Sequence, residues 1–321
     1  MKAAFFDRYG PPKVLRIVDV PKPTPLVNEV LVRVHASTAN QTDCHMRRAN
    51  LFLWRILLGV RRPRAKWRIP GSEFAGEVEA IGAAVTKFAA GDRVFGARSG
   101  ANAEYLCVAQ DRVIAHMPAD TSFEDAAAVP DGFFQAQRAL RSGKVGRDTR
   151  LLVYGASGSC GTAAVQLGKH LGARVTAVCN TENVDLVRSL GADEVVDYLR
   201  DDFTRDGQTY DVILDAVGKL SFLRTRRSLR KGGLWVPTDG LVNIVHALWS
   251  PWFGDGKLVS AGLPRNNQAD LLQLKHLMEA GEYRAVIDGV YPLERVAEAH
   301  RRVESWQKHG SVVVAIVPAS E

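Results

Sequence analysis

The segment 151–161, LLVYGASGSCG, places a glycine-rich turn directly after a short apolar strand. The residues that follow, TAAVQLGKHLGA, have helical spacing, so we expect a strand, a tight turn and a helix in succession. Glycine in such a turn lets the backbone approach a pyrophosphate, whose charge then lies at the helix N-terminus. We therefore predict a cofactor-binding turn made by Gly155, Ser157, Gly158, Ser159, Cys160 and Gly161.

The rest of the segment 122–263 continues this alternation of strands and helices. The apolar runs RVTAVC, EVVDY, YDVILDAVG and GGLWVPT read as strands of a parallel sheet covered on both faces. A helical stretch precedes them, and Ser122 with Asp125 forms a capping box at its start. The pattern predicts an α/β fold with a doubly wound, Rossmann-type sheet.

The first third of the chain has a different pattern. Short alternating segments such as EVLVRVHAS, GEVEAIG and AEYLCVA are typical of antiparallel strands. After residue 263 come a helix, a strand, a helix and a last strand, which we assign to the same β-rich domain. We expect one domain at 1–121 and 264–321, with the α/β domain 122–263 inserted into it.

Composition and charge exclude several classes of protein. The 321 residues are 46% hydrophobic and 24% charged, which is typical of a globular protein and excludes disordered and fibrous chains. The net charge of +7 is concentrated in the segment 47–68. We favour a solvated basic surface there over a nucleic-acid site, because no aromatic and basic RNA signature accompanies it.

Cysteine usage and hydropathy indicate a cytoplasmic protein. The cysteines are scattered without a CxxC pair, which argues against a disulfide framework and fits a reducing compartment. No secretory signal is visible at the N-terminus. The longest apolar run, LFLWRILLGV, is interrupted by Arg55 and is too short to span a bilayer.

The end of the second strand of the α/β domain bears on the choice of cofactor. An acid there normally holds a free ribose 2′-hydroxyl, but the chain has Asn180 and Thr181. This favours NADPH, while Glu182 immediately beyond keeps NADH open. Tyr198 is either a further phosphate ligand or a partly buried surface residue.

Several of these motifs together resemble the medium-chain dehydrogenase/reductase superfamily, in its zinc-independent, quinone-oxidoreductase-like branch. They are PGSEFAGEVEAIG, GDRVFG, AAAVP, VYGASGSCGTAAVQLGKHLGARVTAV, LVRSLGADEVVDY, YDVILDAVG and YPLERVAEAH. The resemblance covers nearly the whole chain in the right order. It implies a GroES-like catalytic domain, a Rossmann domain and a homodimer.

The resemblance also allows a test for zinc. The zinc-dependent members take catalytic ligands from three positions, which here are Asn40, Ser72 and, approximately, Asp131. An amide, a hydroxyl and one carboxylate are not the nitrogen and sulfur set that zinc prefers. Cys44 and His45 lie near Asn40, but adjacent side chains generally point in different directions. We expect no zinc.

The resemblance places further residues at the site. It implies that Asn40, Asp43 and Gln135 border the nicotinamide, although Asp43 is equally a helix-capping residue and relatives carry Thr in place of Gln135. The sequence shows no clear general acid, and water, a ribose hydroxyl and Tyr105 are the open candidates for the proton donor. In the Rossmann domain, Val217, Gly218 and Thr238 are placed to border the cofactor.

Two apolar segments depart from the family pattern, 47–68 and 240–257. Their aromatic residues are either local packing or a lid over a bulky hydrophobic substrate, and they include Phe52, Trp54, Trp249, Trp252 and Phe253. Peripheral membrane contact through the first segment is a third reading.

These observations lead to one hypothesis with three competitors. Without a Lewis acid, hydride from a reduced nicotinamide still reaches an acceptor that is already electrophilic. We therefore predict an NADPH-dependent reductase of a hydrophobic quinone or α,β-unsaturated carbonyl. The alternatives are an alcohol or carbonyl dehydrogenase of the same superfamily, a non-catalytic NADPH-binding regulatory protein and a nucleic-acid-binding protein.

Overall fold

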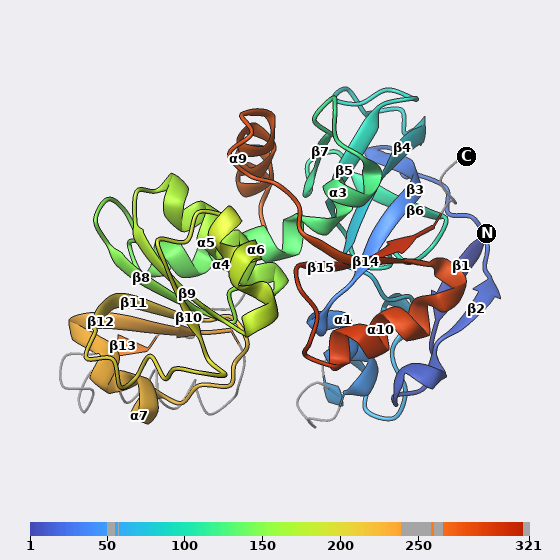
Figure 1. Cartoon of the computed structure of the whole chain (residues 1–321). Helices are drawn as coiled ribbons and strands as arrows, with labels where there is room; N and C mark the ends of the chain where they lie inside the picture. Colours follow the sequence, from blue (N-terminus) through green and yellow to red (C-terminus); the bar gives the residue numbers. More distant parts are fainter. Residues whose placement is uncertain (50–54, 57, 239–257, 260–265, 317–321) are drawn as a thin grey trace. The chain divides into compact units, whose positions relative to one another are not determined.

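A computed structural model describes residues 1–49, 55–56, 58–238, 258–259 and 266–316 (Figure 1). The chain forms two compact units, Met1–Asp131 with Asn266–Glu321, and Gly132–Arg265. The lid residues expected at 52, 54, 249, 252 and 253 lie outside the described residues.

A parallel sheet organises the second unit. Its described strands are β8 (Arg150–Tyr154), β9 (Arg174–Cys179), β10 (Glu194–Asp197), β11 (Tyr210–Asp215), β12 (Leu229–Pro237) and β13 (Leu258–Val259). They lie in the order β10-β9-β8-β11-β12-β13, and every neighbouring pair is parallel. Numbered within the unit, this is 3-2-1-4-5-6, the order of dinucleotide-binding domains. The predicted Rossmann sheet is confirmed.

The helices of this unit follow the strands as predicted. The described helices are α4 (Pro130–Ser142), α5 (Ser159–His170), α6 (Val184–Ser189) and α7 (Phe222–Thr225), with the 3-10 turns η3 (Thr181–Asn183) and η4 (Arg226–Ser228). Helix α5 packs against β8 and β9, and α6 against β9 and β10. The glycine-rich turn therefore connects the first strand of the unit to a helix that packs directly on the sheet.

The strands of the first unit are β1 (Lys2–Phe5), β2 (Arg16–Asp19), β3 (Glu29–Ala39), β4 (Glu73–Ile81), β5 (Arg93–Ala97), β6 (Tyr105–Ala109), β7 (Ile114–His116), β14 (Ile287–Pro292) and β15 (Ser311–Ala315). They pair antiparallel, except β14 and β15, which pair in parallel. The main sheet has the order β14-β15-β3-β4-β5-β7, with β6 also paired to β3. Strand β15 pairs antiparallel with the end of β3, so the last described strand lies in the same sheet as the N-terminal strands.

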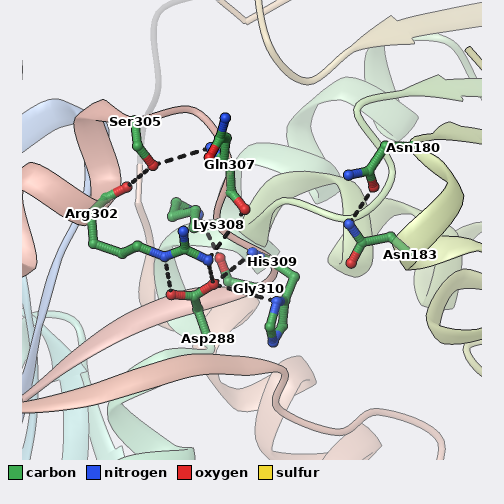
Figure 2. A network of polar contacts seen from close by, with 9 residues as sticks. All are labelled: Asn180, Asn183, Asp288, Arg302, Ser305, Gln307, Lys308, His309 and Gly310. Atoms are coloured by element: carbon green, nitrogen blue, oxygen red, sulfur yellow. Dashed lines mark hydrogen bonds and ion pairs between the residues drawn. The ribbon is translucent and has the colours of Figure 1, made fainter. Parts of the chain in front are cut away.

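Four described helices and three 3-10 turns complete this unit. They are α1 (Gln41–Arg48), α3 (Phe123–Ala128), α9 (Gln268–Glu279), α10 (Val296–Glu304), η1 (Pro12–Val14), η2 (Ala65–Trp67) and η5 (Leu293–Arg295). Val312 and Val314 of β15 join Phe74 of β4 and Val32 of β3 in one buried cluster. A polar network connects α10 to β14, where Arg302 donates two hydrogen bonds to Asp288, at 2.6 and 2.7 Å (Figure 2).

The helical stretch expected from residue 122 onwards is two helices, because α3 ends at Ala128 and α4 begins at Pro130. Ser122 caps α3 by accepting a hydrogen bond from the Asp125 backbone at 3.0 Å. Helix α3 packs against β3 and β4 of the first unit. The predicted boundaries 1–121 with 264–321, and 122–263, stay a prediction, and we describe the molecule by its two compact units.

One arginine of the basic segment differs from the expected solvated surface. Arg47 is fully buried and donates hydrogen bonds to the Gly10 carbonyl and the Glu304 carboxylate. Its Nε lies 3.4 Å from Nδ1 of His300, and burial lowers the pKa of that imidazole to about 3. Since an unpaired buried ion is costly, the Arg47–Glu304 pair specifies how α1 packs on α10. The solvated reading is wrong for Arg47.

Candidate functional site

The glycine-rich turn lies at the carboxyl edge of the parallel sheet, between β8 and α5. Strands β8 and β11 are neighbours where the strand order reverses, and α/β sheets bind ligands at that edge. Gly155 has a φ of +76°, and a Cβ there would lie 2.1 Å from Cγ2 of Val217. A Cβ on Gly161 would lie 2.2 Å from the Gly155 carbonyl oxygen. The fold itself therefore requires glycine at both positions.

Gly158 differs from these two glycines. Its φ is −75°, and a Cβ there would meet only the Gly155 oxygen, at 3.7 Å. Nothing in the described chain therefore requires glycine at 158, and its effect is to leave space in front of α5. The first N–H groups of a helix have no acceptor within that helix, so an anion is favoured in this space. The turn fits a dinucleotide pyrophosphate.

The remaining predicted residues of the turn are Ser157, Ser159 and Cys160. Ser159 and Cys160 begin α5, and Cys160 is buried, while Ser157 precedes the helix and is half-buried. The Ser159 carbonyl accepts a hydrogen bond from Oγ1 of Thr162 at 3.1 Å, which secures the first turn.

Asp215, which the sequence analysis did not single out, organises the neighbouring loop. It is fully buried at the end of β11 and accepts hydrogen bonds from the backbones of Val217, Gly218 and Leu220, at 3.2, 2.9 and 2.8 Å. Burial raises the pKa of this carboxyl. Thr238 donates both its N–H and its hydroxyl to the Asp215 carbonyl, at 3.0 and 2.9 Å. The structure thus brings Val217, Gly218 and Thr238 together at one edge.

Beside the end of β9 lies an acid that the sequence analysis assigned no role, Asp197 at the end of the neighbouring strand β10. Thr181 donates its hydroxyl to Asp197 of β10 at 2.5 Å, and Arg200 pairs with the same carboxylate at 3.4 Å. The Tyr198 backbone donates to the Cys179 carbonyl at 3.0 Å, which holds Tyr198 beside the end of β9. Asn180 accepts a hydrogen bond from the Asn183 amide (Figure 2). Asp197 is therefore already bound by Thr181 and Arg200. The sequence analysis did not identify Arg200 as a cation at this strand end.

In the first unit, two of the three positions tested for zinc, Asn40 and Ser72, contact each other. Asn40 follows β3 and caps α1, where its Oδ1 accepts the Asp43 backbone N–H at 3.0 Å. This bond fixes the orientation of the amide, and its Nδ2 donates to Oγ of Ser72 at 2.7 Å. An amide N–H directed at a hydroxyl is a hydrogen-bonding arrangement and not a set of metal donors.

Asp43 completes the capping box and also supports the adjacent loop. Its Oδ2 accepts the Asn40 N–H at 3.3 Å, and its Oδ1 accepts the Gly71 N–H at 3.1 Å. Asp43 is buried, and burial raises its pKa to about 7. The structure brings Asn40 and Asp43 together, and the capping role expected for Asp43 is confirmed.

Glu73, next to Ser72, is a structural carboxyl. It accepts hydrogen bonds from the Thr38 hydroxyl and, at 2.7 Å, from the Asp131 N–H in the first turn of α4. Glu73 is buried, and burial followed by the charge of Asp131 raises its pKa to about 8. Glu73 thus joins β3, β4 and the start of α4.

Another predicted residue, Tyr105, does not join Asn40 and Asp43 in this cluster. Tyr105 pairs with Arg33 on β3, seven residues before Asn40, which is about 20 Å along a strand. The ring of Tyr105 lies under Nζ of Lys22, 3.8 Å from its centroid. Gln135 lies on α4 in the second unit. We leave Tyr105 out of the proposed site.

The structure does not support a metal site at Cys44 and His45, the other candidate near Asn40. Cys44 is buried with its Sγ 3.4 Å from Nδ1 of His300, and burial raises the pKa of the thiol to about 12. Within the described ranges, no group of three or more His, Cys, Asp and Glu side chains is arranged to hold a metal ion. The same ranges hold no helix that is long and apolar enough to cross a membrane.

The raised pKa of Glu73 predicts a pH dependence of stability. The folded chain retains this proton at a pH where the unfolded chain has lost it, so the contribution is complete below the ordinary pKa of 4.5 and is lost as the pH rises through about 8. We expect Glu73→Gln to reduce the fall in the urea midpoint between acidic and weakly basic pH. Glu77→Gln, an exposed position on the same strand, is the control and should keep the wild-type profile. An unchanged profile in Glu73→Gln would contradict the assignment.

Comparison with known proteins agrees with both units. Residues 27–132 match the alcohol dehydrogenase GroES-like domain, and residues 190–314 match the zinc-binding dehydrogenase family. A chloroplastic quinone oxidoreductase of Triphysaria versicolor is 31% identical, with 98% of each chain covered. An NADPH-dependent alkenal/one oxidoreductase of Arabidopsis thaliana is 28% identical over 99% of this chain and 80% of the relative.

Solved structures lead to the same family. The quinone oxidoreductase from Coxiella burnetii has a TM-score of 0.89 at 27% identity, with 99% of each chain covered. The Escherichia coli quinone oxidoreductase in complex with NADPH has a TM-score of 0.83 at 25% identity, covering 98% of this chain and all of the other. The chain belongs to the medium-chain dehydrogenase/reductase superfamily, in its quinone-oxidoreductase-like branch.

Proposed function

We propose that the chain is a zinc-independent oxidoreductase that transfers hydride from NADPH to a hydrophobic quinone or α,β-unsaturated carbonyl. The observation that carries the proposal is the 2.7 Å hydrogen bond from Asn40 to Ser72, which joins two positions that bind zinc in other members of the superfamily. Residues 190–314 match a family of zinc-binding dehydrogenases. The side chains at the ligand positions of this chain, Asn40, Ser72 and Asp131, are nevertheless not the nitrogen and sulfur donors that zinc prefers. The named relatives are a quinone oxidoreductase and an NADPH-dependent alkenal/one oxidoreductase, which agrees with an acceptor that needs no Lewis acid.

For the cofactor, we assign the pyrophosphate to the space beside Gly158 and the N-terminus of α5. The loop 217–218, held by Asp215, and Thr238 border the same edge of the sheet. At the end of β9 we assign the 2′-phosphate to Asn180, Tyr198 and Arg200, which favours NADPH over NADH. The NADPH complex of the Escherichia coli relative supports this choice.

When bound, the reduced nicotinamide supplies the hydride, and the chain has to stabilise the oxygen that gains charge. Ser72 accepts from Asn40, and its own O–H, which has no acceptor within the described part of the chain, can donate to that oxygen. One hydrogen of the Asn40 amide is used by Ser72, and the second is a further donor. We assign these two groups to the substrate oxygen, with Asp43 positioning Asn40 and Gln135 as a further border of the nicotinamide.

Two further assignments accompany the proposal. All four cysteines are free thiols, which supports a reducing, cytoplasmic setting. The family resemblance supports a homodimer. An alcohol or carbonyl dehydrogenase and a non-catalytic NADPH-binding regulator are the competing functions, and both are outcomes of the following experiment.

A substrate panel tests the function. We expect NADPH oxidation with quinones and enones and little with simple aldehydes, and a lower rate with NADH. Ser72→Ala should lower kcat about tenfold or more, because one donor to the developing charge is lost. Ser99→Ala, on a loop of the same unit, is the control. Turnover of aldehydes alone would favour the dehydrogenase, and tight NADPH binding without any turnover would favour the regulator.

Gly158 provides a separate test of the cofactor site. We expect Gly158→Val to weaken NADPH binding by at least about a hundredfold, because a side chain there would keep the pyrophosphate from the helix N-terminus. Gly146→Val is the matched control, since a Cβ at Gly146 meets nothing within 4 Å. Calorimetric titration with NADPH measures both variants. Unchanged affinity in Gly158→Val would contradict our interpretation of the turn.

A further inference from the structure

A cluster of cations without ion-pair partners lies after α1. No acid occurs between Asp43 and Glu73. Of the cations in this interval, Arg47 and Arg48 pair with Glu304. The others have no acidic partner within the described part of the chain, and we call them the basic patch: Arg55, Arg61, Arg62, Arg64, Lys66 and Arg68.

The basic patch accounts for most of the charge of the protein. Its six cations compare with a net charge of +7 for the whole chain, so the remainder is close to neutral. Six neighbouring cations create a local positive potential, and the rest of the chain, which is nearly neutral, does not cancel it. The patch is thus complementary to a densely anionic surface.

The chain around the patch is held in place by the body of the unit. Tyr9 donates its hydroxyl to the Gly59 carbonyl at 2.6 Å, and the Phe6 N–H donates to the Arg68 carbonyl at 2.9 Å. Leu58 and Pro63 are buried. The exposed arginines are therefore presented from an anchored loop.

Exposed aliphatic side chains accompany these cations. Ile56 is 48% exposed and Val60 is 56% exposed, and they lie between Arg55 and Arg61 in the sequence. Cations beside exposed aliphatic groups are typical of a surface that lies on a bilayer, where the apolar groups enter the headgroup boundary. The aromatic ring of Trp67 is half-buried with Nζ of Lys66 5.1 Å from its centroid, so it offers little face for stacking a base.

We infer that the basic patch, with Ile56 and Val60, docks the protein on an anionic lipid bilayer. The attraction comes from Arg61, Arg62, Arg64 and Lys66 facing lipid headgroups, and the two aliphatic side chains add apolar burial. The inference rests on charge and exposure alone and does not depend on the proposed oxidoreductase function.

Vesicle co-sedimentation of the full chain tests this docking. We expect binding to phosphatidylcholine vesicles that contain phosphatidylserine, at least about tenfold weaker binding to pure phosphatidylcholine, and loss of binding as salt is raised. The triple variant R61E/R62E/R64E should bind anionic vesicles at least about a hundredfold more weakly. The variant I56S/V60S should weaken binding while leaving the salt dependence unchanged.

The matched control is K13E/K87E/R112E, which makes the same change in net charge at exposed positions elsewhere in the first unit. It should retain vesicle binding to within about threefold, because these positions lie outside the patch. Circular dichroism and NADPH binding by each variant show whether it is folded. Equal binding to both vesicle types, or an equal loss in the control, overturns the inference. Binding of an RNA oligonucleotide through the patch without vesicle binding would also overturn it and assign the patch to nucleic acid.

Discussion

The first unit depends on how one buried amide divides its hydrogen bonds. Asn40 caps α1 through its oxygen and holds Ser72 through its nitrogen, so the end of β3, the start of α1 and the loop before β4 are fixed together. Asp43 adds a bond to Gly71 in the same loop. Because the amide oxygen accepts the Asp43 N–H and one amide hydrogen is donated to Ser72, the orientation of the amide is determined. The segment Pro70–Gly76 is in this way held by hydrogen bonds with β3 and α1.

Two carboxyls near this amide are buried, and neither forms an ion pair within the described part of the chain. Asp43 and Glu73 are both satisfied by N–H or O–H donors, and burial raises the pKa of each. Carboxyls in such surroundings serve to position backbone and helices, and they bind protons more tightly than they do in solution. Glu73 therefore holds β3, β4 and the start of α4 together beside Ser72.

Features with a local pattern were predictable from the sequence. Alternation along β3, β4 and β6, the continuous apolar runs of β8, β9 and β11, and the glycine spacing around α5 were sufficient to indicate both units. Features that depend on distant partners were not predictable. Arg47 looked like part of a solvated basic run, and its burial depends on Glu304, 257 residues away. The contact between Thr181 and Asp197 joins two strand ends, which a linear search for an acid after β9 does not detect. Asp215 did leave a local signal. It ends a strand and comes three residues before Gly218, and an Asp in such a position often closes a turn with its side chain.

Metal analysis combined with turnover tests the central claim most directly. The Asn40–Ser72 hydrogen bond takes the place of a zinc site in this account. After exhaustive chelation, with zinc content measured on the same sample, the rate of NADPH oxidation by a quinone should be unchanged and zinc should be far below one per chain. Activity that disappears with the chelator and returns in proportion to added zinc would contradict the account.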